Sequence, residues 1–173
     1  DYSFIDNFVR LAASAIHNAP TLADRLPLAA FLGIIAGPEN TYFQRSFQAL
    51  NVPLSEQEQP NLLTPTSDFQ ALMLKAANSG NYGNMVAVLS VAEWVYLSWA
   101  QPVADRADSL PFYFAQWINL HAGEYFESVV EHLRSQLDSA YLTANRDEQA
   151  EISDYFQQAV LLERQFFDAC YQA

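Results

Sequence analysis

Apolar residues recur at intervals of three and four along most of the 173-residue chain. This period is that of an amphipathic helix, whose apolar stripe faces a core. Alternation with a period of two never persists for more than a few residues, so no strand is expected. The pattern predicts an all-α fold, a compact bundle of about seven helices in a single domain over residues 1–173. The helices are expected at 2–17, 21–50 with a break or bend at Gly37-Pro38, 67–78, 82–102, 110–120, 123–137 and 147–171, and 51–66 is expected to be a surface connection.

Carboxylates interrupt the apolar stripes of three predicted helices. Glu93 lies in the middle of the most apolar stretch, Tyr82–Val103, and Glu163 holds the equivalent position in the last helix. The stripe of the first helix, extended backward, ends on Asp1. A buried carboxylate is unfavourable unless it is paired or protonated. Each acid alone is explained by a structural hydrogen bond or a misjudged helix face, but three together indicate convergence in one interior cavity.

Carboxyl groups in an apolar cavity have raised pKa values and act as general acids or bases near neutral pH. They also bind an amidine-like heterocycle through paired hydrogen bonds. Tyr96, one helical turn after Glu93, is placed to add a hydroxyl to the same space. Aromatic residues make up 14% of the chain and suit either a packed core or walls that stack a flat ring.

Charge and cysteine content exclude several classes of protein. The chain has 8 Lys and Arg against 20 Asp and Glu, a net charge of −12, so it should repel a nucleic acid backbone. Cys170 is the one cysteine, which excludes an intrachain disulfide and fits a reducing compartment. The longest uncharged run, 76–92, contains Asn, Ser and Gly residues and is not expected to span a membrane. We therefore expect a cytoplasmic protein without nucleic acid or membrane partners.

The histidines argue against a metal site in the predicted bundle. Di-iron helical bundles use Glu-x-x-His pairs, and none of His17, His121 and His132 has a carboxylate three residues before it. His17 and His132 are expected at the surface, whereas His121 lies in an aromatic region and is either buried or exposed. No metal and no other cofactor is predicted.

Four stretches together resemble one known family. They are the opening DYSFI, the block SGNY leading into AEWVYLSW, the segment Trp117–Phe126 and the closing LERQFF. Their order and spacing are similar to those of the TenA/thiaminase II family, which has a haem-oxygenase-like helical fold. The resemblance covers nearly the whole chain, but the sequence starts inside the family's Gln-Asp-Tyr motif. It implies that an N-terminal helix or two precedes Asp1.

The resemblance also implies roles for individual residues. Asp1 corresponds to the acid that binds the aminopyrimidine of the substrate, Tyr96 to a tyrosine of the catalytic element, and Glu163 to the acid/base at the scissile nitrogen. Where many members have a nucleophilic cysteine this chain has Ala92, followed by Glu93, as in the cysteine-lacking TenA_E branch. The substrate-binding residues by this resemblance are Asp1, Phe4, Phe69, His121 and Phe166, and the catalytic ones are Glu163, Glu93 and Tyr96.

Two functions follow as expectations. The first is a metal-independent hydrolase of thiamin salvage that acts on an aminomethyl- or formylaminomethyl-4-amino-2-methylpyrimidine. The second is a non-catalytic small-ligand-binding or regulatory protein of the same fold, which the missing cysteine favours. The segment where di-iron relatives place a glutamate followed by a histidine has Glu39 and Phe43 here, so no metal set is complete. Relatives are commonly tetramers, and a homo-oligomer is expected.

Overall fold

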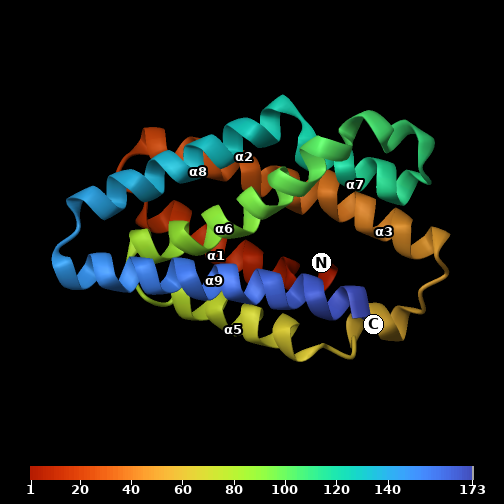
Figure 1. The fold of residues 1–173 in the computed structure, drawn as a ribbon, viewed down its shortest axis with the longest axis horizontal. Coiled ribbons are helices and arrows are strands. Elements are labelled where there is room, and N and C mark those ends of the chain that lie inside the picture. Colours follow the sequence, from red (N-terminus) through yellow and green to blue (C-terminus); the bar gives the residue numbers. More distant parts are fainter. Residues whose placement is uncertain (173) are drawn as a thin grey trace.

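The computed structural model describes residues 1–172 as a bundle of helices with no strand among them (Figure 1). The all-α prediction is confirmed, and the expected set of about seven helices is close to the observed one. The main helices are α1 (Ile5–Asn18), α2 (Leu22–Ile34), α3 (Asn40–Ala49), α4 (Leu54–Glu58), α5 (Thr64–Ala77), α6 (Tyr82–Ala100), α7 (Phe112–Ala122), α8 (Glu124–Thr143) and α9 (Arg146–Gln172). Shorter helical segments are η1 (Tyr2–Phe4), η2 (Ile35–Glu39) and η3 (Gln101–Ser109).

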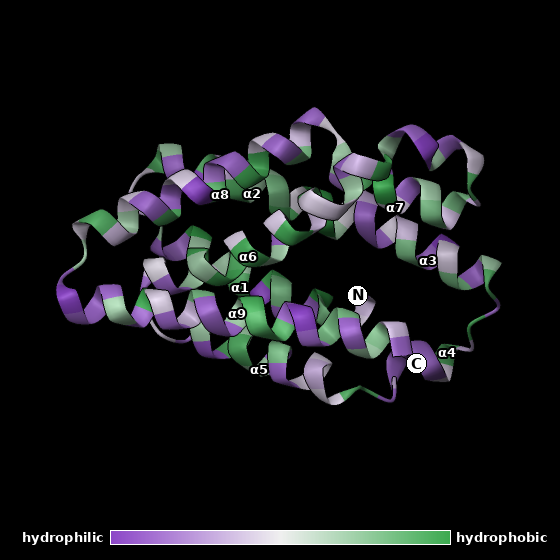
Figure 2. Ribbon diagram, viewed as in Figure 1, coloured by the Kyte–Doolittle hydropathy of each residue, from purple (hydrophilic) through white to green (hydrophobic). Residues whose placement is uncertain are grey.

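Helix α6 is the centre of the bundle, as its apolar sequence predicts. It packs against α8 and α9, and also contacts α1, α5 and α7. Every residue from Gly83 to Glu93 is buried, so this half of the helix has no solvent-facing side. Gly83 allows the close approach of α9, because a β-carbon there would clash with the side chain of Ile152. By contrast, α8 and α9 alternate between polar and apolar positions, visible as purple and green in Figure 2.

Side-chain caps begin three helices where the sequence indicates helix starts. Thr21 and Asp24 form a reciprocal capping box at α2. The side chain of Asn81 accepts a hydrogen bond from the amide of Gly83 at the start of α6. Asn145 accepts from the amides of residues 147 and 148 at the start of α9. Because these caps satisfy amides that lack helical partners, they fix the ends of the elements that pack around α6.

Of the predicted break or bend at Gly37-Pro38, the break does not occur, because the chain passes through the π-helical segment η2 directly into α3. Two other local predictions need correction. Helix α5 begins at Thr64 with Pro65 in its first turn, three residues before the predicted start at residue 67. The predicted surface connection 51–66 contains α4, and the segment after α6, residues 101–109, is 3₁₀-helical. Proline is compatible with the first turn of a helix, so its presence did not mark a loop.

The length and hydropathy of the helices in residues 1–172 also bear on membranes. None of them is long and apolar enough to cross a bilayer.

Candidate active site

One cavity collects the residues that the sequence singled out. It lies among α1, α2, α5, α6, α7, α9 and the segments η1 and η2, near the N-terminal end marked in Figure 1. We call it the acidic cavity because four of its lining residues carry carboxyl groups: Asp1, Glu39, Glu93 and Glu163. Its volume of about 60 Å³ exceeds the roughly 10–15 Å³ that one water requires. The space therefore suits a small molecule.

Glu93 and Glu163 are buried on facing helices. Their exposed fractions are 8% and 3%. Burial raises the pKa of Glu163 to about 8, and it raises the pKa of Glu93 well above its usual value, with Glu39 and Glu163 adding repulsion. The Oε2 atom of Glu163 is buried without a hydrogen-bond partner in residues 1–172. A neutral carboxyl group with a free oxygen is thus held against the cavity.

Tyr96 joins the N-terminal end of the chain to α6. Its hydroxyl donates a hydrogen bond to Oδ1 of Asp1, as the predicted proximity of these residues requires. Burial raises the pKa of Tyr96 well above its usual value, and the charges of Glu163 and Glu93 add to this effect. Tyr96 is therefore a neutral donor at physiological pH. Asp1 itself is exposed at the rim of the cavity, so it is less buried than the stripe pattern predicts.

His121 is buried in the cavity wall, with an exposed fraction of 5%. Its Nδ1 atom lies 2.8 Å from the carbonyl oxygen of Trp117, an acceptor, so Nδ1 carries the proton. Burial lowers the pKa of His121 to about 4, which leaves the ring neutral and Nε2 free to accept a hydrogen bond. The ring packs edge-on to Trp117 at 4.3 Å between centroids. His121 thus offers an acceptor, not a positive charge.

Aromatic rings form the apolar walls of the cavity. Phe4 and Phe69 both line it and contact each other edge-to-face at 5.4 Å. Phe166 is not among the lining residues; it packs on Phe4 at 4.8 Å and supports that ring from behind. Sequence reasoning missed the further lining residues Phe8 and Phe31 as parts of the site, whereas Trp117, which also lines it, belongs to the aromatic residues that suit either core or walls. Their helical spacing marked them only as core, since apolar walls and apolar cores share one pattern.

Glu39 is a functional candidate that sequence reasoning considered only as part of an incomplete metal set. It lies in η2, half-buried, and lines the acidic cavity. Burial raises the pKa of its carboxyl group to about 7. Because η2 is π-helical, the spacing of three and four that identifies core positions fails across it. The π-helical turn itself, which often accompanies functional sites, could have been suspected only from the Gly37-Pro38 pair.

The remaining candidate residues lie outside the cavity. Cys170, the one cysteine, is exposed on α9. His17 is exposed as predicted, while His132 is half-buried with Nε2 at 3.3 Å from the carbonyl oxygen of Asp24. Among the described residues no three His, Cys, Asp or Glu side chains are grouped so that they could hold a metal ion.

Comparisons with known proteins agree with this arrangement. A curated relative, the aminopyrimidine aminohydrolase of Halalkalibacterium halodurans, is 22% identical over 173 residues, which cover 99% of this chain and 77% of the relative. A crystal structure described as a TenA family transcription regulator from Silicibacter sp. TM1040 superposes with a TM-score of 0.76 at 16% identity, covering 94% of this chain and 74% of the other. This likeness shows that the fold is shared. The model of the TENA/THI-4/PQQC family matches residues 1–173, and the chain belongs to this family.

Proposed function

We propose that the protein is a thiamin-salvage hydrolase of the cysteine-lacking branch, acting on a 4-amino-2-methylpyrimidine that carries an aminomethyl or formylaminomethyl group. The observation that carries the proposal is the pair of buried carboxyl groups, Glu93 and Glu163, in one aromatic-walled cavity. Family membership and the aminohydrolase named among its relatives support the substrate class. Ala92 lines the cavity beside Glu93, so the wall lacks a thiol there.

The proposed chemistry uses water as the nucleophile. Hydrolysis of the aminomethyl compound breaks the carbon–nitrogen bond and gives the hydroxymethylpyrimidine and ammonia. Hydrolysis of the formylaminomethyl compound breaks the amide bond and gives the aminomethylpyrimidine and formate. Glu93 accepts a proton from the attacking water, and Glu163 donates one to the leaving nitrogen. Both reactions therefore balance without an oxidant or a further reactant.

The pKa of Glu163 is consistent with its proposed role as proton donor. With a pKa of about 8, Glu163 is mostly protonated at neutral pH and is ready to donate. Glu93 acts as a base only after losing its own proton, which bound hydrogen-bond donors or a positive charge would favour. Asp1, held by Tyr96, pairs with the ring nitrogen and exocyclic amine of the pyrimidine. The rings of Phe4 and Phe69 supply the apolar surface for the ring.

The test is to incubate the protein with each pyrimidine and to follow the products by mass spectrometry. Release of the hydroxymethyl or aminomethyl product is expected, and it should survive exhaustive dialysis against a chelator. Elemental analysis should find no stoichiometric iron, manganese or zinc. Activity lost with the chelator and restored by one added metal would contradict the mechanism, and would make the carboxylates ligands instead of acids and bases.

A non-catalytic role is the second candidate. A cavity that lacks the cysteine suits a protein that binds a pyrimidine without converting it, and the solved relative is described as a transcription regulator. Calorimetric binding of both pyrimidines without product formation would favour this candidate over the hydrolase.

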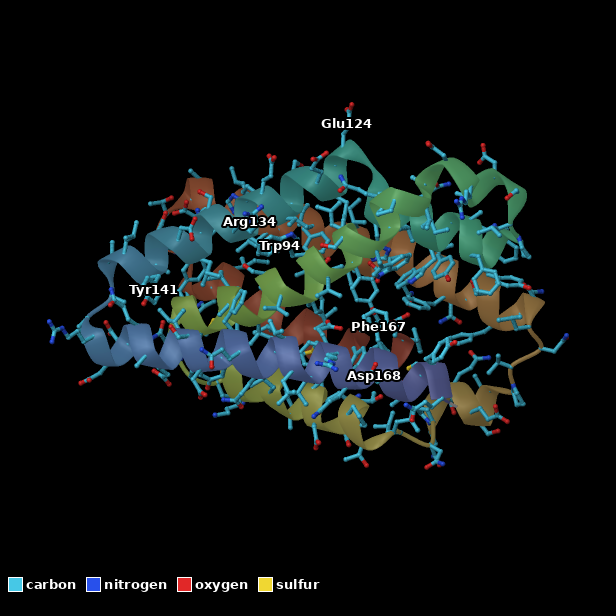
Figure 3. All side chains as sticks on the ribbon, in the orientation of Figure 1. Trp94, Glu124, Arg134, Tyr141, Phe167 and Asp168 are labelled. Atoms are coloured by element: carbon cyan, nitrogen blue, oxygen red, sulfur yellow. The ribbon has the colours of Figure 1, made fainter. Side chains whose placement is uncertain are left out.

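We also propose that the protein forms a homotetramer. Large aromatic side chains remain partly exposed in the single chain, including Trp94 on α6 at 39% and Phe167 on α9 at 37%. The guanidinium of Arg134 on α8 lies over the ring of Trp94, 4.0 Å from its centre. Trp94, Arg134 and Phe167 are labelled in Figure 3. Contacts with further copies would cover such rings. Light scattering that gives the mass of a monomer would contradict the proposal.

A further inference from the structure

The lining of the acidic cavity contains acidic side chains but no basic side chain that is charged at neutral pH. Four of its residues carry carboxyl groups, and none of its lining residues is Lys or Arg. The one imidazole, that of His121, is held neutral by burial, which lowers its pKa to about 4. An anion such as a phosphate ester would meet no Lys or Arg partner there. A ligand that is cationic or rich in donors would meet acceptors from α6, α9 and η2.

Three carboxyl groups of this cavity, those of Glu39, Glu93 and Glu163, form no hydrogen bond within residues 1–172, whereas Asp1 is bound by Tyr96. Oε2 of Glu163 is buried without a hydrogen bond in residues 1–172, although the residue is only 3% exposed. The carboxyl group of Glu39 forms no hydrogen bond or salt bridge with the same residues. Buried polar groups are otherwise nearly always satisfied. These unpaired oxygens point to a ligand that supplies donors.

We propose that Glu39 binds the positively charged amine of the substrate, and so makes the cavity selective for an aminomethylpyrimidine over the neutral formylaminomethyl compound. This inference rests on the proposed function and identifies which of its two substrates the site prefers. Asp1 and Glu163 already have roles at the ring and at the leaving nitrogen by family resemblance, whereas Glu39 has none. Before the carbon–nitrogen bond breaks, the ammonium gives its extra proton to ionised Glu39, and Glu163 then donates its own proton to the neutral nitrogen as ammonia leaves. Glu39 lines the cavity from η2, and its carboxyl group has no hydrogen-bond or salt-bridge partner within residues 1–172, so it is available for a cation.

Electrostatics supports this role for Glu39. Its charge acts on Glu93 and is the largest influence on the pKa of that group after burial. The titratable side chains that face this space are Asp1, Glu39, Glu93, Tyr96, His121 and Glu163. At physiological pH each of these side chains is neutral or negative, because Tyr96 and His121 remain uncharged. An ammonium group placed among them relieves the repulsion between carboxylates and favours loss of a proton from the acids.

Glu39→Gln tests the inference, with Glu131→Gln as the matched control. Gln keeps the volume but removes the charge, and Glu131 is an exposed glutamate on α8. For Glu39→Gln we expect KM for the aminomethyl compound to rise about 10- to 100-fold, while KM for the formylaminomethyl compound changes by less than about threefold. Any change in kcat should be the same for both substrates, because Glu39 also acts on Glu93, which serves both. The control should change neither KM nor kcat. An equal effect of Glu39→Gln on KM for both substrates, or no effect on either KM, would overturn the inference.

Calorimetry with an unreactive amine gives a readout that does not depend on turnover. Benzylammonium and the neutral benzyl alcohol are titrated into the wild-type protein at pH 7 in two buffers of different ionisation enthalpy. We expect benzylammonium to bind with release of protons to the buffer, benzyl alcohol to bind without release, and Glu39→Gln to weaken the first only. Benzylammonium that binds no tighter than the alcohol would refute the role of Glu39. If neither pyrimidine is hydrolysed but benzylammonium binds as expected, the hydrolase proposal fails and the cation site stands.

Discussion

Two carboxyl groups in different parts of the bundle have contrasting surroundings. Asp24, in the first turn of α2, accepts hydrogen bonds from the hydroxyl and amide of Thr21 and from Nε2 of Gln136. These hydrogen bonds hold the pKa of Asp24 below its usual value, and the one from the Thr21 side chain has the largest effect. Glu163 in α9 has a buried oxygen without a partner in residues 1–172, and burial raises its pKa to about 8.

The difference separates a structural acid from a functional one. The hydrogen bonds of Asp24 favour its ionised form and cap a helix, so the group contributes to folding. No hydrogen bond within residues 1–172 reaches the buried Oε2 of Glu163, so the fold tolerates an unfavourable group there. Such a cost is typical of a site whose partner is a substrate. The predictions below compare the two kinds of acid, beginning with the largest effect.

Glu163→Gln should reduce kcat by about 10²- to 10⁴-fold, because the proposed proton donor is lost while its volume is kept. The matched change at the start of α2, Asp24→Asn, should leave kcat within about twofold of the wild-type value, because Asp24 lies outside the acidic cavity. Steady-state kinetics on the pyrimidine substrate checks both. Near wild-type turnover of Glu163→Gln would make this residue structural, like Asp24.

Glu93→Ala should cause a similar loss of turnover, because the base that activates water is removed. Its free energy of unfolding should stay the same or increase, since a buried acid is eliminated. Urea denaturation measured beside the kinetic assay checks the pair of effects. A variant that is less stable but fully active would assign Glu93 a structural hydrogen bond instead of a catalytic role.

The sequence indicated most of this contrast but not all of it. The helix starts near residues 21 and 147 were predicted, and Glu93 and Glu163 stood out because each replaces an apolar residue on an apolar stripe. Glu39 could not be found in this way, because η2 departs from the α-helical period. The position of Phe166 behind Phe4, outside the cavity, also depends on packing between α9 and η1 that no local pattern reveals.

The stability of the protein should depend on pH through Glu163. Its folded-state pKa, about 8, lies above the value of 4.5 expected without burial. The folded state therefore holds this proton more tightly, and the associated stability is complete below pH 4.5 and is lost as the pH rises through 8. The melting temperature of Glu163→Gln, relative to wild type, should increase between pH 5 and about 8. A constant difference across this range, measured by calorimetry, would contradict the raised pKa.

The smallest expected effect concerns the capping box of α2, to which Asp24 belongs. Thr21→Ala removes the capping box of α2 and should lower the free energy of unfolding by about 1 kcal/mol. Activity should be unchanged, because Thr21 lies outside the acidic cavity. Chemical denaturation and the kinetic assay check this prediction together. A large loss of activity would show that the start of α2 and the acidic cavity are coupled, and the comparison between them would no longer hold.

The most direct test of the central claim is a titration of the Glu163 carboxyl carbon by ¹³C NMR, assigned by comparison with Glu163→Gln. The account predicts an apparent pKa of about 8, so that the acid is protonated at neutral pH and able to serve a leaving nitrogen. Saturation with the hydroxymethylpyrimidine product should change this resonance, because the ligand occupies the cavity that Glu163 lines. An apparent pKa near 4.5, unaffected by the product, would contradict the account, since Glu163 would then be an ordinary ionised acid.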